Sequence, residues 1–351
     1  MRDMSKAHRV LAMLAAGSLL LLDSRTPENG FSLTSVSAAT KPVRFDLQGH
    51  RGARGLRPEN TLAAFSYALS LGVSTLEMDC AVTKDGVVVV SHDSELNPDH
   101  TRDFEGRWLE KTGPSLFSLS YDELRRYDVG RLKPGTGYAA RYPDQQPVDG
   151  ERIPRLADVF ALVAKSGNRE VRFNIETKIY PPRPELTTAA RPFAEALVRE
   201  IRAAKLEKRA VIQSFDLRTL KVAQEIAPEI DTVLLTQQRS PFEDNIQAGK
   251  PGPSPWMAGL DIDDFGGSVP KLVKASGARV WSPNYLDVDA AKTQEAHALG
   301  LTVIPWTANE TEDMARVIGY GVDGLISDRP DRLRAVLIEK GIAVPKPTPV
   351  K

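Results

Sequence analysis

The chain has one cysteine, Cys80, among its 351 residues, and its charges cancel. One cysteine excludes an intramolecular disulfide, and no later cysteine offers a lipid attachment site. With 46 basic and 46 acidic side chains the formal net charge is zero, so no overall charge attracts a polyanion and no nucleic-acid partner is expected. The first apolar run is not followed by Gly-x-Gly-x-x-Gly, and no P-loop pattern occurs, so nucleotide binding has no support.

Long apolar runs are also scarce, and the longest one stands at the N-terminus. Val10 to Leu22 follows a basic segment and is interrupted only by Gly17 and Ser18. Its length of about 13 residues is short for a membrane span, which needs roughly 20, but is typical of a secretory signal. We therefore expect a signal peptide and leader over residues 1–38 and an exported protein, periplasmic or extracellular, with no membrane span after the leader is removed. A retained N-terminal anchor is the alternative.

Beyond the leader, short apolar runs alternate with helical patterns. The alternation gives eight βα units and predicts an α/β fold, a (β/α)8 TIM-type barrel over residues 39–345. A doubly wound open sheet would alternate in the same way, but residues with chemical potential stand at the ends of many strands, which favours a barrel. An extra hairpin strand is expected at Val87 to Val90, beside the second barrel strand. The predicted strands after the first, which ends at Gly49, are 75–81, 171–177, 210–214, 232–236, 279–282, 302–306 and 324–327.

Two long segments interrupt this alternation. Residues 94–152 are too long for an ordinary connection and contain seven Phe, Trp and Tyr residues. We expect an insertion subdomain with an aromatic core of its own. Residues 237–269 are rich in proline and carry Trp256 and an acidic cluster that lacks the spacing of a calcium loop, so we expect a solvated rim loop.

Three carboxylates stand on predicted strands. Glu77 and Asp79 are two residues apart, and because strand side chains alternate, they point to the same face. Glu176 and Lys178 repeat this spacing on another strand. Carboxylates buried inside a barrel would repel one another without a cation, and oxygen ligands suit calcium, magnesium or manganese better than zinc. The pattern predicts a divalent metal site at Glu77, Asp79 and Glu176, with Lys178 placed to meet an anionic substrate.

Of the five histidines, only His50 and His92 stand at the ends of predicted strands. The turn Thr83 to Gly86 should bring His92 back beside Glu77, or beside Asp79 if the pairing slips by two residues. His8 lies in the leader, and His100 and His297 have no motif around them. Because imidazole titrates near neutral pH, one histidine of a pair can take a proton while the other gives one.

Four motifs stand in order: His50-Arg51-Gly52, Pro58-Glu59-Asn60-Thr61, Glu77-x-Asp79 and His92-Asp93. In these motifs the sequence resembles the glycerophosphodiester phosphodiesterase family, and within that family it resembles the exported bacterial members. The resemblance covers roughly residues 45 to 335. Further matches are Asn174-Ile175-Glu176-Thr177-Lys178, Gln213-Ser214-Phe215, Trp306-Thr307-Ala308-Asn309, Asp323-Gly324 and Ser327-Asp328-Arg329-Pro330.

The resemblance implies a barrel that hydrolyses glycerophosphodiesters, such as glycerophosphocholine and glycerophosphoethanolamine, to glycerol 3-phosphate and an alcohol. It implies that His50 is the general base and His92 the general acid, that the cation is calcium more readily than magnesium, and that an insertion sits over the barrel mouth.

The remaining site residues are open to two interpretations. The guanidinium of Arg51 suits phosphate oxygens, with a structural salt bridge as the alternative. The resemblance places Glu59 in the site without a defined role, and it makes Phe215 and Trp306 either substrate walls or core residues. Two other functions are alternatives: a barrel phospholipase acting on lysophospholipids or phosphoinositides, and a non-enzymatic glycerophosphodiester-binding protein. The second would require a broken histidine pair, and both histidines are present.

Overall fold

The computed structural model describes residues 45–238 and 244–351, which belong to one unit of the chain, 44–351. The predicted leader, 1–38, lies outside the described residues, and so do residues 239–243 of the predicted rim loop. Within the described part of the chain, no helix has the length and apolar character to cross a membrane.

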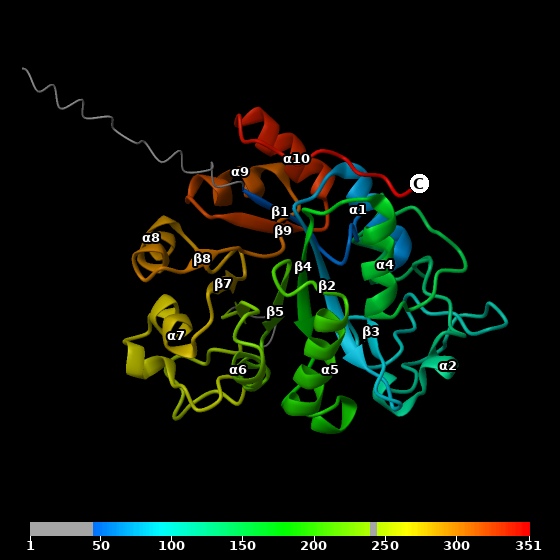
Figure 1. Ribbon diagram of the computed structural model, residues 1–351, viewed down its shortest axis with the longest axis horizontal. Helices are drawn as coiled ribbons and strands as arrows, with labels where there is room; N and C mark the ends of the chain where they lie inside the picture. The colour runs from blue at the N-terminus through cyan, green and yellow to red at the C-terminus, as the bar shows by residue number, and fades with distance from the viewer. Residues whose placement is uncertain (1–44, 239–243) are drawn as a thin grey trace, which may run out of the picture. The chain divides into compact units, whose positions relative to one another are not determined.

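Eight parallel strands are neighbours in the order β8-β7-β6-β5-β4-β2-β1-β9. Helices lie around these strands (Figure 1). Two backbone hydrogen bonds join the ends of this series, from Asp323 N to Val303 O and from Ile326 N to Pro305 O, both at 2.9 Å. The predicted (β/α)8 TIM-type barrel is therefore confirmed. The strands are β1 (Asp46–Gly49), β2 (Thr75–Val82), β4 (Arg172–Thr177), β5 (Ala210–Ser214), β6 (Thr232–Thr236), β7 (Val280–Pro283), β8 (Thr302–Val303) and β9 (Gly324–Ser327).

A helix follows each barrel strand and packs its apolar side against the sheet, and the first helix shows how the sequence sets the limits. The Thr61 hydroxyl accepts a hydrogen bond from Ala64 N at 3.2 Å and starts α1, and Gly72, at a φ of 83°, ends it. Large side chains such as Phe65, Phe173 and Trp281 are fully buried in the main core. The long helices are α1 (Leu62–Leu71), α4 (Leu156–Ser166), α5 (Ala190–Ala203), α6 (Leu217–Ile226), α7 (Val269–Ser276), α8 (Ala290–Ala298), α9 (Thr311–Gly319) and α10 (Pro330–Glu339).

The extra hairpin strand is present as β3 (Val88–Val90), antiparallel to β2. Its register pairs Val82 with Val88, which is one residue away from each of the two expected registers. The reason is the loop: Thr83 N donates to Val87 O at 3.0 Å, which leaves three residues in the turn, and Gly86 takes the left-handed conformation at a φ of 79°. Three-residue hairpins commonly end in such a residue.

The insertion, 94–152, lies between β3 and α4 and contains η1 (Leu116–Ser118), α2 (Tyr121–Leu124) and α3 (Gly137–Ala140). A second hydrophobic cluster joins the insertion to β2 and β3. Its buried members are aliphatic, and Tyr121 and Tyr127 pack against them, so the expected aromatic core is present only in part. Phe104 is 63% exposed, and Tyr138 and Tyr142 line the cavity described below. The buried members of the cluster are Ala81, Val89, Leu96, Leu116, Leu124, Val129 and Ile153.

The described part of the predicted rim loop is not simply solvated. Trp256 is buried and contacts the rings of Phe215 and Tyr180, and Ile246 and Met257 join the main core. This corrects the expectation for residues 237–269. Two short 3-10 helices complete the described elements, η2 (Pro184–Leu186) and η3 (Ile262–Phe265).

Candidate active site

The carboxyl ends of the barrel strands open into a cavity of about 1120 Å³. Its lining includes eight of the ten residues predicted for the site, and it adds residues from the insertion and from the loop after β6. The predicted residues in the lining are His50, Arg51, Glu77, His92, Glu176, Lys178, Phe215 and Trp306. Asp79 and Glu59 contact members of this set. All ten predicted residues therefore meet at one end of the barrel, where such enzymes place their active sites.

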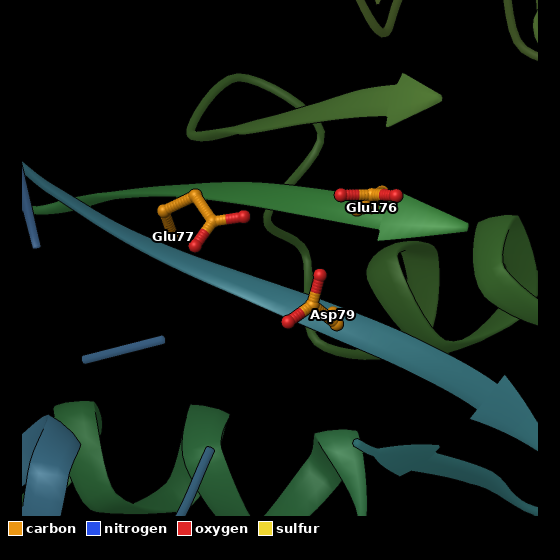
Figure 2. A group of neighbouring side chains, drawn as sticks. All are labelled: Glu77, Asp79 and Glu176. Atoms are coloured by element: carbon orange, nitrogen blue, oxygen red, sulfur yellow. The ribbon is translucent and has the colours of Figure 1, made fainter. Parts of the chain in front are cut away.

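The three carboxylates form one buried cluster (Figure 2). Glu77 and Asp79 come from β2, and Glu176 comes from the neighbouring strand β4, where the parallel register sets it opposite Asp79. One oxygen from each residue lies within 4.8 Å of the others. The i, i+2 spacing and the strand register together place three like charges in a volume that one ion can fill.

Burial raises the pKa of Glu77 well above its ordinary value, and it raises the pKa of Glu176 to about 7. Burial would also raise the pKa of Asp79, but Arg51 and Lys178 outweigh it and hold that pKa well below the ordinary value. The Asp79 Oδ1 atom is buried and accepts no hydrogen bond. A crowded carboxylate set with an unsatisfied oxygen fits a divalent cation with hard oxygen ligands.

The His-Arg-Gly turn after β1 shapes the floor of the site. Arg51 adopts a left-handed φ of 49°, and its backbone N–H donates to Glu77 Oε2 at 2.8 Å. Gly52 follows at a φ of 84°, and a Cβ there would meet Ala64 at 2.8 Å, so only glycine fits. The strained turn fixes one oxygen of a predicted metal ligand.

The Arg51 side chain is held by carboxylates on two sides. Its Nη1 lies 2.6 Å from Glu59 Oε1, and its Nε lies 3.1 Å from Asp79 Oδ2. Burial would raise the pKa of Glu59, but Arg51 and Arg54 lower it to about 2. The Tyr138 hydroxyl, from the insertion, donates to Glu59 Oε2. Glu59 therefore positions Arg51. In this structure Arg51 forms the salt bridge that was the alternative to phosphate contact.

The next residue of the same motif supports the cluster directly. Asn60 takes a left-handed φ of 56°, which asparagine tolerates better than most residues. Its Nδ2 donates to Asp79 Oδ2 at 2.9 Å, and its Oδ1 accepts from Asp79 N at 3.3 Å. Pro58-Glu59-Asn60-Thr61 is therefore a turn in which one residue orients Arg51, one orients Asp79 and one caps α1.

His50 is oriented by Asp328, which follows β9. The Nδ1 atom lies 2.6 Å from Asp328 Oδ1, and Nε2 lies 3.9 Å from Glu77 Oε2. Asp328 also accepts from Arg54 Nε at 2.8 Å and from Asn309 Nδ2 at 2.8 Å. Burial and the nearby Arg54 charge lower the pKa of His50 to about 4. Burial would raise the pKa of Asp328, but Arg54 and His50 lower it by more, so Asp328 is ionised. It therefore accepts a hydrogen bond from the Nδ1–H group of His50.

His92 has the same kind of support from the insertion side. Its Nδ1 lies 2.7 Å from Asp93 Oδ1, and Asp93 Oδ2 accepts from Asn97 Nδ2 at 2.7 Å. His100 Nε2 lies 3.5 Å from the same oxygen. Burial lowers the pKa of His100, but Asp93 and Glu59 raise it above its ordinary value. His100, which has no motif around it, therefore contacts the carboxylate that orients His92.

Lys178 joins the carboxylate cluster to an aromatic wall. Its Nζ lies 2.7 Å from Glu176 Oε1 and 5.8 Å from the centre of the Phe215 ring. Phe215 meets Trp306 edge to face at 5.5 Å and Trp256 at 6.5 Å. The two predicted aromatic residues line the cavity, and Trp256 extends the wall.

Sequence reasoning gave no role to several residues that shape this site. Arg54 pairs with Asp328 and stacks 4.8 Å over the Tyr142 ring, but it lies outside the motif His50-Arg51-Gly52. Asn60 and Asp328 lie within quoted motifs, which was the available signal, although their partners are far away in sequence. Tyr138 carries no local signal, because a single tyrosine in a long insertion does not reveal that it reaches the barrel.

The strand ends of this (β/α)8 barrel present a buried carboxylate cluster, two histidines held by carboxylates, and the basic side chains of Arg51 and Lys178. This set of groups is typical of a barrel hydrolase that acts on anionic esters. The profile of the "Glycerophosphoryl diester phosphodiesterase family" matches residues 50–332. The chain belongs to this family, which confirms the predicted family and the predicted enzyme class, glycerophosphodiester phosphodiesterase.

Known proteins agree with this assignment. A glycerophosphodiester phosphodiesterase of Caldanaerobacter subterraneus subsp. tengcongensis is 30% identical over 83% of this chain and 97% of its own length. A crystal structure of a Silicibacter pomeroyi protein assigned as a glycerophosphoryl diester phosphodiesterase has a TM-score of 0.76 and 36% identity, covering 86% of this chain and 96% of its own. An Oleispira antarctica phosphodiesterase, solved with the product sn-glycerol-3-phosphate, shares the fold at a TM-score of 0.59 and 20% identity, covering 83% and 96%.

Proposed function

We propose that this phosphodiesterase uses a divalent cation and two histidines to hydrolyse glycerophosphodiesters, with glycerophosphocholine and glycerophosphoethanolamine as substrates and glycerol 3-phosphate as the common product. The observation that carries the proposal is the pair His50 and His92. Each has its Nδ1 held by a carboxylate, and both line the cavity that contains the carboxylate cluster. The product seen in the Oleispira antarctica enzyme supports a small-molecule substrate of this kind.

Glu77, Asp79 and Glu176 would hold the cation. All-carboxylate sets suit the flexible coordination of calcium, which we favour over magnesium. When bound, the cation supplies positive charge against the phosphoryl oxygens. Arg51 and Lys178 add fixed positive charge from the protein and would bind the same oxygens, each moving away from part of its present carboxylate contact.

His50 is suited to be the general base. Since ionised Asp328 accepts the Nδ1 proton, the Nε2 atom keeps its lone pair and faces the cluster. The low pKa of His50, about 4, keeps the ring neutral near neutral pH. Its role is to take a proton from the attacking oxygen.

His92 is suited to be the general acid for the departing alcohol. Its side chain is 33% exposed, so it can exchange protons with solvent between turnovers. Asp93 fixes the ring by its Nδ1, which leaves Nε2 to deliver the proton. Phe215 and Trp306 would form an apolar wall for the glycerol or the headgroup.

A lysophospholipid is a second candidate substrate, because apolar side chains stand exposed where the cavity meets solvent. Tyr180 is 37% exposed and Leu286 is 45% exposed, and both line the cavity. An acyl chain leaving the site would pass over such residues.

The test measures glycerol 3-phosphate released from glycerophosphocholine, glycerophosphoethanolamine and glycerophosphoinositol. In the lipid arm it measures choline released from lysophosphatidylcholine, whose other product is lysophosphatidic acid. We expect turnover of the first two, loss of activity after chelation, and recovery on adding calcium more than on adding magnesium. Glu176→Gln should not recover with either ion at the concentration that restores the parent. Full turnover after thorough chelation would overturn the metal role, and preference for the lipid arm would favour the second candidate.

We further propose export, on the charge and apolar pattern of residues 1–38. Mass spectrometry of the protein from its native envelope or medium should find a mature chain that begins near residue 39. Recovery from the cytoplasm with its first residues intact would contradict this.

A further inference from the structure

The interior of the barrel contains a chain of side-chain amides that ends at a predicted metal ligand. Gln213 Nε2 donates to Glu77 Oε1 at 2.7 Å, and Gln213 Oε1 accepts from Asn174 Nδ2 at 2.9 Å. The same Asn174 Nδ2 donates to Gln48 Oε1 at 2.9 Å, and Gln48 Nε2 donates to Asp46 Oδ2 at 2.8 Å. All five residues are buried, at 5% exposure or less. Barrel interiors are usually filled by branched apolar side chains, so this chain is an exception that calls for a reason.

The donors and acceptors of this chain follow a strict order. A carboxyl group stands at each end, Glu77 at the mouth of the barrel and Asp46 at the start of β1, and each accepts a hydrogen bond from the amide beside it. Each amide between two acceptors must therefore donate outward, and one amide must donate in both directions. Asn174 does this with the two hydrogens of Nδ2. Its Oδ1 is then left over, and that atom is indeed buried without a hydrogen-bond partner.

The Asp46 end of the chain is anchored. Asp46 Oδ2 lies 2.5 Å from the Arg172 guanidinium, so a fixed charge at the amino end of the barrel sets the direction of the first amide. Reversing the amides would turn the oxygen of Gln48 toward Asp46 and the oxygen of Gln213 toward Glu77. Both reversals place oxygen against oxygen, so the order is set from both ends.

We propose that Asn174 and Gln48 are positioning residues for the cation: through Gln213 they hold the Glu77 carboxyl group in one orientation, so that this ligand is in place before the ion binds. The inference rests on the proposed metal dependence. In the described part of the chain the cavity lining includes Gln213 but neither Asn174 nor Gln48, so these two act through contacts and not on substrate. Losing an outer partner of a metal ligand typically weakens metal binding about 10- to 100-fold.

The experiment is a calorimetric titration of the whole protein with calcium and, separately, with magnesium. Asn174→Leu removes the two-way donor, and we expect its dissociation constant for the preferred ion to rise about 10- to 100-fold. Gln48→Met keeps the volume and cuts the link to Asp46 one step further from the site, so we expect a smaller rise, about threefold to tenfold. Thermal unfolding of each variant checks that it folds, and Gln48→Met serves if Asn174→Leu does not.

The matched control is Thr236→Val. Thr236 Oγ1 accepts a buried hydrogen bond from Trp281 Nε1 at 2.8 Å, and this bond is not part of the amide chain. This variant should lose thermal stability while binding the cation like the parent. If the parent binds neither ion, the metal role itself fails. If the parent binds and the folded Asn174 or Gln48 variants bind within twofold of it, the amide chain has no positioning role.

Discussion

Asp328→Asn isolates the role of His50 without changing the volume of any side chain. In the structure both Asp328 oxygens face donors: Oδ1 receives His50 Nδ1 and Arg54 Nε, and Oδ2 receives Arg54 Nη2 and Asn309 Nδ2. An amide nitrogen at the first position turns a donor toward His50 Nδ1 and forces the proton onto Nε2, where it blocks the base. At the second position it opposes Arg54 and Asn309.

The second arrangement opposes two fixed donors, whereas the first opposes only Arg54 Nε because His50 can change its tautomer, so we expect the first. The first arrangement removes the general base, whose contribution is about 10²- to 10⁴-fold. At about 1.36 kcal/mol per factor of ten, this equals about 2.7 to 5.4 kcal/mol of transition-state stabilisation. We expect kcat to fall by that factor while KM changes little, because Asp328 acts on a proton and does not bind the phosphate. The measurement is steady-state release of glycerol 3-phosphate from glycerophosphocholine at saturating calcium.

The control for this variant is Asp323→Asn. Asp323 Oδ2 lies 2.9 Å from His297 Nε2, so it offers the same pair of side chains on the outside of the barrel. It should unfold at a lower temperature but keep the turnover of the parent. If Asp328→Asn folds and keeps more than about a tenth of the parental kcat, the orientation of His50 by Asp328 is not what makes it a base.

Three further outcomes follow from the site. His92→Ala should retain far more activity on the nitrophenyl ester of glycerol 3-phosphate, whose nitrophenolate leaves without a proton, than on glycerophosphocholine. His50→Ala should be poor on both substrates. Equal losses would remove the assignment, and the reverse pattern would swap the roles of the two histidines. His100→Ala frees Asp93 and should cost about tenfold on glycerophosphocholine and little on the nitrophenyl ester, and an equal loss on both would refute this route. Because burial raises the pKa of Glu176 to about 7, this residue must lose a proton to bind the cation, so calorimetric cation affinity should rise from about pH 6 to about pH 8; a flat profile would contradict the raised pKa.

The sequence was a good guide wherever periodicity and turn residues agreed. The limits of β5 and β6 match their predicted ranges, because each is a clear apolar run bounded by polar residues. The prediction for 302–306 was too long. The regular strand ends at Val303. Pro305 has no N–H to donate, but Ile304 N and Trp306 N still donate to Trp281 O and Pro283 O of β7, at 3.0 and 2.9 Å.

The candidate site divides in the same way. The i, i+2 rule placed Glu77 and Asp79 on one face, and that rule depends only on local geometry. The partners of these residues depend on which strand lies next to which and on where long side chains point. Asp328 and His100 therefore could not be assigned from spacing, since one comes from the last strand of the barrel and the other from an insertion whose path no periodicity describes.

The contact between His50 and Asp328 joins residues that are 278 positions apart, one after the first barrel strand and one after the last. Contacts of such sequence separation form late in folding, because the whole intervening chain must be ordered before its ends meet. Catalytic turnover therefore requires that the barrel has closed between β1 and β9. During refolding from denaturant, secondary structure should return first and catalytic activity should return only with the slowest phase. Under the proposed export, a chain that crosses the membrane unfolded would be unable to attack phosphodiesters before it refolds.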